Sequence, residues 1–301
     1  HRSFMEVNPV LIKEYKKSTT LRRTKTDSVD CESIARWLIT VEYKPHSKGF
    51  YHAYSLKSLT RLRDRLIRQR SFYLVKITNV LDHTFPEFKP FFNERLSKTA
   101  LYLLENYGSA EKMARMNSAS YDKLRCISRG KFSIQQFLRL KELAANTVGV
   151  NNSIFDLELN TLLTLYKSLS DEINTLETEI IKLIEEVHPH YMSIPGIGPI
   201  SAAVIYAEYG DISNFSNPGQ MLAFAGIEPG INDSGTESHG GRMVKHGSSQ
   251  LRYVLLNACL PLIRFDLTFA TYYEKKRAEG KKHRVAITHV AKKLIRVIYA
   301  L

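Results

Sequence analysis

Two carboxylates near the start of the chain have a spacing that suits a metal site. Asp27 and Asp30 are three residues apart, so on a helix both side chains project from one face. Such a pair is able to share a Mg²⁺ ion, and nucleases that use two metal ions need carboxylates to hold them. A helix start explains the same residues, with Asp27 as the N-cap and Asp30 in the first turn. The residues alone leave both interpretations open.

A second set of candidate groups lies in the segment 230–247, which is dense in glycine, polar and basic residues. Ser234 precedes a glycine, and a serine exposed on a turn can act as a nucleophile. Arg242, Lys245 and Arg252 would offer positive charge to a pentavalent phosphate. The alternative is a solvated loop in which the residues around Ser234 only supply turn chemistry.

The segment 193–203 has the pattern of a turn in a helix-hairpin-helix, apolar-Pro-Gly-Ile-Gly-Pro followed by small residues. Gly196 and Gly198 are expected to take positive φ values and, having no side chain, to let a phosphate approach the main chain. Pro199 suits the first turn of the next helix, whose free amides favour an anion. The motif predicts a grip on a nucleic-acid backbone, and an ordinary loop is the alternative.

The elements that must position these groups are mainly helical. Residues 3–9 are expected to form a short strand that leads into a helix from near Asp27, as the remnant of an α/β unit over residues 1–54. Residues 55–82 form the next predicted helix, and residues 84–154 a small helical subdomain.

An unbroken apolar repeat at 159–187 predicts a coiled coil. Residues 155–187 hold two Lys and eight Asp plus Glu, whereas residues 61–70 of the preceding helix hold five Arg. That basic helix is therefore a candidate antiparallel partner within a helical and coiled-coil region at 55–188. Pairing with a second copy of the chain instead would give a homo-oligomer, a dimer or a tetramer.

Residues 189–301 are expected to form a helical C-terminal domain. Asn217 is suited to cap a helix that begins at Pro218 and ends before Gly226, and further helices are expected near 248–264 and 284–301. The charge run that contains Lys281 and Lys282 is expected to lie along phosphates. A solvated surface is the simpler explanation of that run.

Composition points to a polyanion as the partner. The 301 residues include 43 Lys plus Arg and 30 Asp plus Glu, for a net charge of +13 and a pI near 9.5, which is typical of nucleic-acid binders. No apolar run approaches the roughly 20 residues of a membrane span. Three unpaired cysteines fit a reducing cytoplasm. The start at His1 suggests a partial chain.

Taken together, these motifs resemble those of the insertion-sequence transposases of the one-ten and eleven-eleven groups, which are DEDD recombinases. The resemblance extends over almost the whole chain. The matching motifs are Val7-Asn8-Pro9, Leu21-Arg22-Arg23-Thr24-Lys25-Thr26-Asp27-Ser28-Val29-Asp30, Ile34-Ala35-Arg36, Ile194-Pro195-Gly196-Ile197-Gly198-Pro199, Phe224-Ala225-Gly226-Ile227-Glu228-Pro229, Ser234-Gly235, Gly241-Arg242-Met243-Val244-Lys245-His246-Gly247 and Leu251-Arg252.

The resemblance implies a RuvC-like, RNase H-type N-terminal domain, a coiled coil used in assembly and a C-terminal transposase domain. It implies that Asp27 and Asp30 are the last two acids of the DEDD set and that Ser234 attacks DNA to form a phosphoserine. In the family the first Asp and the Glu lie upstream of the Asn-Pro strand, so this chain is expected to be truncated at its N-terminus and to cleave poorly alone.

The predicted function is therefore a transposase or recombinase that exchanges DNA strands at element ends and target, guided by a bridge RNA encoded beside the element. The nearby serines at 238, 248 and 249 are alternatives to Ser234 as nucleophile. Two other functions stay open: a metal-dependent junction resolvase or nuclease that uses only the carboxylates, and a nucleic-acid-binding protein without catalysis. A cytoplasmic, nucleoid-associated protein is expected.

Overall fold

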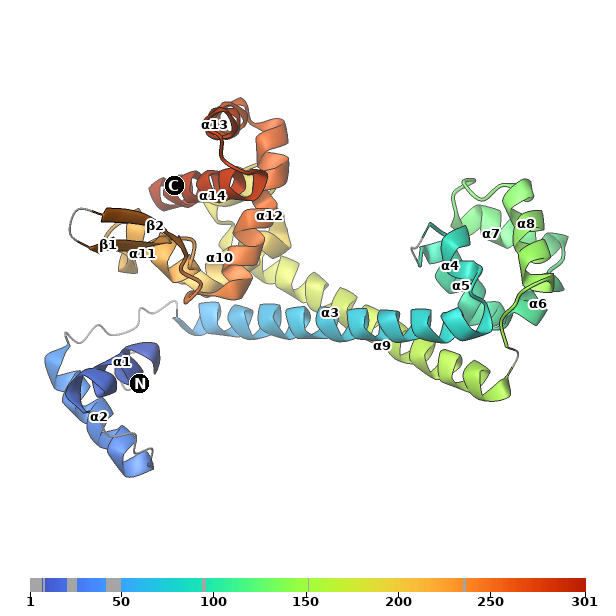
Figure 1. Cartoon of the computed structure of the whole chain (residues 1–301), viewed down its shortest axis with the longest axis horizontal. Helices are drawn as coiled ribbons and strands as arrows, with labels where there is room; N and C mark the ends of the chain where they lie inside the picture. The colour runs from blue at the N-terminus through green and yellow to red at the C-terminus, as the bar shows by residue number, and fades with distance from the viewer. Residues whose placement is uncertain are drawn as a thin grey trace. The chain divides into compact units, whose positions relative to one another are not determined.

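The structure is a computed structural model that describes residues 7, 9–20, 26–41, 50–93, 96–150, 152–234 and 237–301. Helices dominate this part of the chain (Figure 1). Two compact units divide it: one is Ser58–His188, and the other combines His1–Lys57 with Pro189–Leu301.

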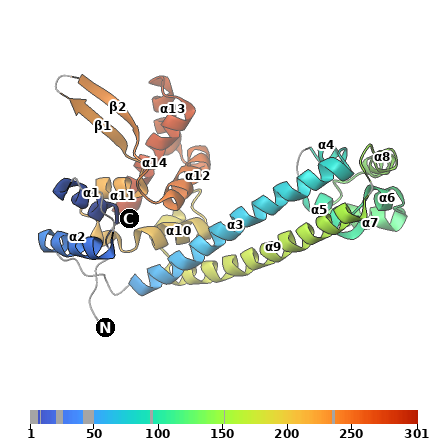
Figure 2. The ribbon, with the colours of Figure 1, turned by 60° about the horizontal axis from the view of Figure 1, so that its bottom comes forward.

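Two long helices, α3 (Phe50–Thr84) and α9 (Ser153–Val187), run side by side in opposite directions (Figures 1 and 2). Arg63 Nε donates to Glu177 Oε1 at 2.8 Å, and the ring of His83 stacks on that of Phe155, with 5.8 Å between centroids. The predicted antiparallel pairing of the basic and acidic helices is therefore confirmed. Of the five buried residues on α9, Leu159, Ile173 and Ile180 belong to the predicted repeat, whereas Leu163 and Ile184 each lie one position after a residue of that repeat.

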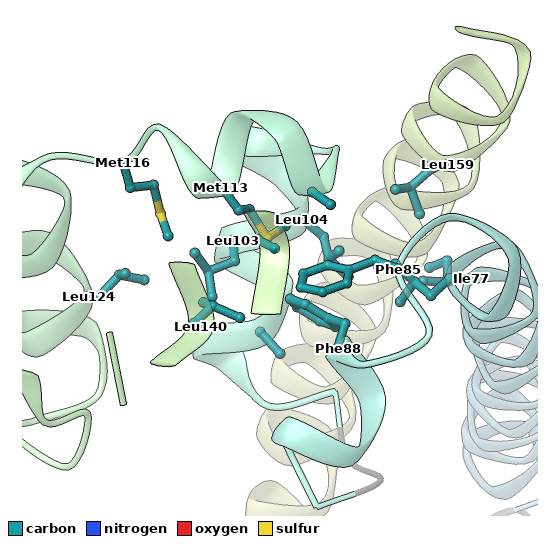
Figure 3. Packing of buried hydrophobic residues seen from close by; sticks show 14 of the residues in the cluster. Ile77, Phe85, Phe88, Leu103, Leu104, Met113, Met116, Leu124, Leu140 and Leu159 are labelled. Atoms are coloured by element: carbon teal, nitrogen blue, oxygen red, sulfur yellow. The ribbon is translucent and has the colours of Figure 1, made fainter. Parts of the chain in front are cut away.

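Five short helices connect α3 to α9, over the stretch where a small helical subdomain was expected. They are α4 (Phe88–Phe91), α5 (Lys98–Tyr107), α6 (Ala110–Ala114), α7 (Ser118–Ile127) and α8 (Ile134–Ala145). Their apolar residues meet the ends of the two long helices in one cluster, where Phe85, Phe88 and Leu104 lie close together (Figure 3). Serine and asparagine side chains cap α5, α6, α7 and α8, so local sequence also defines where these helices begin.

The N-terminal segment contributes two helices, α1 (Pro9–Thr19) and α2 (Asp27–Thr40). The start of α2 matches the prediction, whereas α1 was not predicted. The strand expected at 3–9 lies mostly outside the described residues, and Pro9 already belongs to α1. The described residues of this segment therefore contribute helices only to the expected α/β unit.

The C-terminal segment is helical apart from one hairpin. Asn217 caps α11 (Pro218–Ala225), and Gly226 ends it with φ +65°, as predicted. The other helices are α10 (Pro199–Tyr209), α12 (Ser249–Phe265), α13 (Leu267–Ala278) and α14 (His283–Ala300). Of these, α13 was not predicted as a helix. The apolar face of α14 is buried as expected, and includes Ile287, Val290, Ala291, Leu294 and Ile298.

A two-stranded antiparallel sheet occupies most of the segment that was expected to be a loop. It consists of β1 (Pro229–Ser234) and β2 (Glu237–Met243), and Ser234 pairs with Glu237 at the end next to the turn. The helical C-terminal domain that the sequence predicted therefore also contains a strand pair, and the expectation of a loop over most of this segment was wrong. Strand pairing between two short polar segments leaves a weaker sequence signal than an apolar helix face.

Within the described residues, no single helix combines the length and apolar content needed to cross a membrane. Among the described helices, α12 and α13 have sufficient length and apolar content only when they are taken as one segment, and the chain bends by 105° between them.

Candidate functional site

The two predicted metal ligands lie in the first turn of α2. Thr26 precedes them as the N-cap, and its hydroxyl accepts a hydrogen bond from Val29 N at 3.4 Å. The interpretation of Asp27 as the cap was therefore wrong, because the threonine before it takes that position. Asp27 is exposed and Asp30 is half-buried. Both carboxylates are at the helix end where the dipole favours negative charge.

Asp30 already has a cationic partner. Lys16 Nζ on α1 donates to Asp30 Oδ1 at 2.6 Å, a contact between two helices that the sequence did not indicate. In the part of the chain that the structure describes, His, Cys, Asp and Glu form no group of three or more that would hold a metal. Mg²⁺ is commonly held by one or two carboxylates together with waters and substrate phosphates. Asp27 and Asp30 fit that minimal role if Asp30 exchanges Lys16 for the metal.

Ser234 is the last residue of β1, directly before the turn of the hairpin. The main chain there is described, whereas the side chains of residues 229–242, Arg242 included, lie outside the described part. Of the alternative serines, Ser238 pairs with Asp233 in the hairpin. Ser248 caps α12 and accepts a hydrogen bond from Leu251 N at 3.2 Å. A helix cap accounts for Ser248 without any catalytic role.

The glycine turn before α10 differs in detail from the prediction. Gly196 has φ +93°, but Gly198 is the N-cap of α10 with φ −80°, so the positive φ predicted for Gly198 was wrong. A Cβ atom at Gly196 would lie 2.6 Å from the Ala258 carbonyl oxygen and 2.6 Å from Pro261 Cγ. The absent side chain of Gly196 thus serves packing against α12 and not the approach of a phosphate.

Gly198 keeps the open surroundings that anion binding requires. A Cβ atom there would meet none of the described atoms within 4 Å. The first hydrogen bond of α10 runs from Ala202 N to Gly198 O at 2.9 Å, so the preceding amides have no partner within the helix. Before the turn stands only a 3-10 segment, His190–Ser193, where a longer first helix was expected. The predicted anion site therefore reduces to Gly198 and the start of α10.

Arg252 has a structural contact that the sequence did not indicate. Its Nη1 atom donates to the Ala225 carbonyl oxygen at 3.3 Å, at the end of α11. A Cβ atom at Gly226 would lie 2.6 Å from the same Nη1 atom, and one at Gly247 would lie 2.1 Å from the Phe224 carbonyl oxygen. Two glycines and an arginine that are distant in sequence thus meet at the base of the hairpin, where cationic side chains stabilise helix carbonyls.

Three predicted phosphate ligands, Lys245, Lys281 and Lys282, are exposed. Lys245 follows β2, while the other two lie in the connection between α13 and α14. Arg277 Nη1 donates to the Lys281 carbonyl oxygen at 2.7 Å, which orders that connection. The two lysines are therefore displayed on a defined turn.

Lys293 on α14 belongs to the same basic region and was missed by sequence analysis. Its Nζ atom lies 5.1 Å from the centroid of the Phe269 ring and 5.0 Å from that of Tyr272, and it donates to the Thr268 carbonyl oxygen at 3.3 Å. These contacts fix Lys293 between α13 and α14, because a cation is attracted to the face of an aromatic ring. The two aromatic residues lie on α13, which was not predicted as a helix, so the sequence around Lys293 gave no sign of this contact.

Positive charge is crowded along α14. Burial lowers the pKa of His289, and the charges of Lys292, Lys276 and Lys281 lower it further, against a smaller opposite effect of Glu279. Burial also lowers the pKa of Lys292, and Arg296 adds to that effect while Glu228 opposes it. A bound anion would relieve this repulsion. The electrostatics therefore favour a polyanion at α14.

Comparison with known proteins gives a family match for the N-terminal segment and another for the C-terminal segment of the chain. A family described as "Transposase IS116/IS110/IS902 family" matches residues 189–274, the segment that holds the glycine turn, the hairpin and Arg252. A DEDD transposase family of the IS110 type, described as "Transposase", matches residues 1–86, which include Asp27 and Asp30. The chain belongs to the IS110/IS1111 family of transposases. The resemblance inferred from the motifs is thus confirmed at the level of the family.

Individual relatives agree with this assignment. An uncharacterised protein of insertion element IS110 from Streptomyces coelicolor is 28% identical over 75% of this chain and 57% of its own length. An uncharacterised protein of insertion element IS900 from Mycobacterium paratuberculosis is 27% identical over 92% of this chain and 71% of its own. The transposase for IS1111A from Coxiella burnetii is 25% identical over 86% and 59%. The chain thus spans between 57% and 71% of the length of these IS110/IS1111 relatives.

Proposed function

We propose that this chain takes part in transposition of an insertion sequence by cutting and rejoining DNA. The observation that carries the proposal is the family membership of two separate segments, one with the paired carboxylates and one with the glycine turn and hairpin. The net charge of +13 supports a nucleic-acid partner, and phosphate contacts of this kind serve DNA and RNA alike.

Ser234 is the proposed nucleophile. Its Oγ atom would form an ester with a DNA phosphorus as a DNA oxygen leaves and its own proton is lost, and a hydroxyl of the second strand would then displace the serine and restore it. The position of Ser234 at the end of β1, where it pairs with Glu237 of β2, is compatible with this role. Lys245 and the start of α10 would hold phosphates on either side of the reacting one.

Asp27 and Asp30 are the proposed Mg²⁺ ligands. When bound, the ion would polarise a phosphate oxygen and offset the charge that develops in the transition state. Lys16 is the group that competes with it for Asp30. With two carboxylates only, the affinity of the chain for Mg²⁺ is expected to be low.

A guide RNA encoded beside the element and a homo-oligomer complete the proposal. Recombination joins two DNA sites at once, so at least two copies of the chain are expected in the active assembly. The antiparallel partner of α9 is α3 of the same chain, so the repeat at 159–187 no longer requires a second copy. The proposal of a homo-oligomer therefore rests on the need to join two DNA sites and not on the coiled coil.

The decisive experiment looks for a covalent intermediate. The chain, with and without the additional N-terminal residues of a longer relative, is incubated with Mg²⁺, element-end DNA and the adjacent RNA, and denaturing gels are searched for a protein–DNA adduct. Ser234→Ala should abolish the adduct, whereas Ser238→Ala and Ser248→Ala should retain it. Free DNA ends without any adduct would favour the resolvase, and tight binding without any product would favour the non-catalytic binder.

A further inference from the structure

The subdomain between α3 and α9 carries a basic segment that the proposed function does not use. Residues 123–141, from α7 through the turn into α8, contain six Lys plus Arg and neither Asp nor Glu. A stretch of this composition is unusual in a chain whose basic and acidic residues number 43 and 30. The local charge is concentrated at one connection between two helices.

Five of these six side chains are exposed, and they are Lys123, Arg125, Arg129, Lys131 and Arg139. Among the residues that the structure describes, none of the five forms an ion pair with an Asp or Glu. Other arginines of the same unit do have one: Arg63 pairs with Glu177, and Arg115 pairs with Glu111. Unneutralised cations grouped on one surface create the positive potential that attracts polyanions.

The turn is held on a rigid support. Leu124 of α7 and Leu140 of α8 are fully buried and point into the apolar cluster (Figure 3). Ser128 N donates to Leu124 O at 2.9 Å, and Ser128 Oγ accepts from Phe132 N at 3.0 Å. Exposed charges on a fixed turn lose less conformational entropy on binding than charges on a mobile loop.

Arg129 has a left-handed backbone conformation, which is uncommon for a residue with a side chain. It closes α7 with φ +53°, and Gly130 follows it with φ +79°. The hydrogen bonds Gly130 N to Arg125 O (2.8 Å) and Arg129 N to Cys126 O (3.0 Å) are those of a Schellman motif. Glycine is the usual residue at the position of Arg129, because a side chain there is strained. An exposed arginine at such a position points to a role for its charge.

We infer that the turn between α7 and α8, with Arg125, Arg129 and Lys131 at its centre, is a second binding surface for the phosphate backbone of a nucleic acid. This surface is separate from the glycine turn and the basic connection of the C-terminal segment. It depends on neither Ser234 nor strand exchange. The strand bound there is DNA or the guide RNA, since both offer the same phosphates.

Binding by the full chain tests the inference. Affinity for a random-sequence DNA duplex, for the RNA duplex of the same sequence and for the single strands is measured against salt concentration. The triple variant Arg125→Ala, Arg129→Gly, Lys131→Ala should lower the slope of log K against log salt by about two to three and weaken binding about tenfold or more at 0.1 M salt. The substrate that shows the loss identifies the strand.

The matched control removes the same charge elsewhere in the unit Ser58–His188. Lys98→Ala, Lys112→Ala, Lys167→Ala takes three exposed cations from α5, α6 and α9. This control should change the slope by less than about one. Equal losses for both triple variants would mean diffuse charge and would overturn the inference, as would an unchanged slope for the first variant with every substrate.

Two further measurements guard against misfolding of the triple variant. Arg129→Gly alone should melt at the same or a higher temperature while its salt slope falls by about one. In a Cys31→Ser background, exposed Cys126 should react with a thiol reagent severalfold more slowly when nucleic acid is bound. Full reactivity of Cys126 at saturating nucleic acid, or an Arg129→Gly variant with unchanged affinity, would overturn the inference even if strand exchange is intact.

Discussion

Two short turns that each lead into a helix are built in opposite ways. Before α10, Gly196 takes φ +93°, and any side chain would strike the Ala258 carbonyl oxygen. Before α8, Arg129 takes φ +53° and its side chain is exposed. The first turn has glycine where the neighbouring helix leaves no room, and the second has a charged residue where glycine would be easier to accommodate.

The difference separates residues that serve packing from residues that serve a surface. Where the backbone of a glycine touches a neighbouring helix, the lack of space for a side chain accounts for the glycine. An exposed arginine in the left-handed region carries a local cost in backbone strain, and binding through its side chain would offset that cost. The comparison assigns Gly196 to the fold, and it leaves Gly198 and Arg129 as the groups to test for nucleic-acid binding.

The largest effect is expected for Gly196→Ala. A Cβ atom would lie 2.6 Å from two atoms of α12 and the residue would be forced to a positive φ, so the free energy of unfolding should fall by about 3 kcal/mol. Denaturant unfolding measures it. The control Gly198→Ala has open space and a negative φ, and it should lose less than about 1 kcal/mol. Similar losses of unfolding free energy at both positions would contradict the distinction between a packed Gly196 and an open Gly198.

Arg252→Ala should come next. It removes the hydrogen bond to the Ala225 carbonyl oxygen, and a lost bond of this kind costs about 1–2 kcal/mol. The exposed Lys245 serves as the control, because Lys245→Ala should change stability by less than about 0.5 kcal/mol. Thermal melts and salt-dependent binding on the same samples separate the two roles. An Arg252→Ala protein of unchanged stability that binds poorly would make Arg252 a ligand and not a support.

A gain of stability is expected for Arg129→Gly. Relief of the left-handed strain should raise the free energy of unfolding by about 0.5–1 kcal/mol. Arg125→Gly removes the same charge from within α7 and should instead cost roughly 0.5–1 kcal/mol. Opposite signs for two variants of equal charge, measured by denaturant unfolding, would support the comparison of the two turns. A loss for both would show that Arg129 does serve packing.

The smallest effect is a pH dependence confined to the C-terminal segment. His289 has a pKa below its ordinary value of 6.5, because of burial and of Lys292, Lys276 and Lys281, which Glu279 only partly offsets. Phosphates bound near α14 would raise that pKa, so binding takes up a proton, and affinity should rise as pH falls from the pKa of the bound form toward the lower pKa of the free form. Binding isotherms between neutral and mildly acidic pH test this.

The control for this pH effect is His289→Gln, which should flatten it. The triple variant at Arg125, Arg129 and Lys131 should leave it intact, because it does not change His289 or any of the charged groups that shift the pKa of His289. A pH effect that survives His289→Gln would place its origin elsewhere in the chain.

Elements with strong local signals were predicted well. The boundaries of α11 follow from Asn217, Pro218 and Gly226, all of which act on their own helix end. The apolar repeat predicted which face of α9 is buried, because apolar residues at helical spacing all lie on one side of a helix. By contrast, α13 has Phe269 as its only buried residue among those described, so it offered no such stripe.

The sequence named residues of the candidate site, but it did not predict the contacts that these residues make. Asp27 and Asp30 were correctly placed at the start of a helix, but Lys16 as the partner of Asp30 lies on a helix that was not predicted. Gly196 and Gly198 look equivalent in the sequence, and only the position of α12 distinguishes them. Contacts between segments far apart in the chain leave no periodic signal, so spacing alone could not reveal them.

The sequence by itself determined the family and the mainly helical class, and it predicted a basic helix as a candidate partner of the acidic one and a polyanion as a candidate ligand. These follow from charge, apolar period and capping residues, whose effects are local or additive. Tertiary structure decided which glycine faces a helix and which faces solvent, which arginine supports a carbonyl, and that Arg129 is strained. Those properties arise where distant segments meet, because sterics and hydrogen bonding there depend on neighbours that the local sequence does not specify.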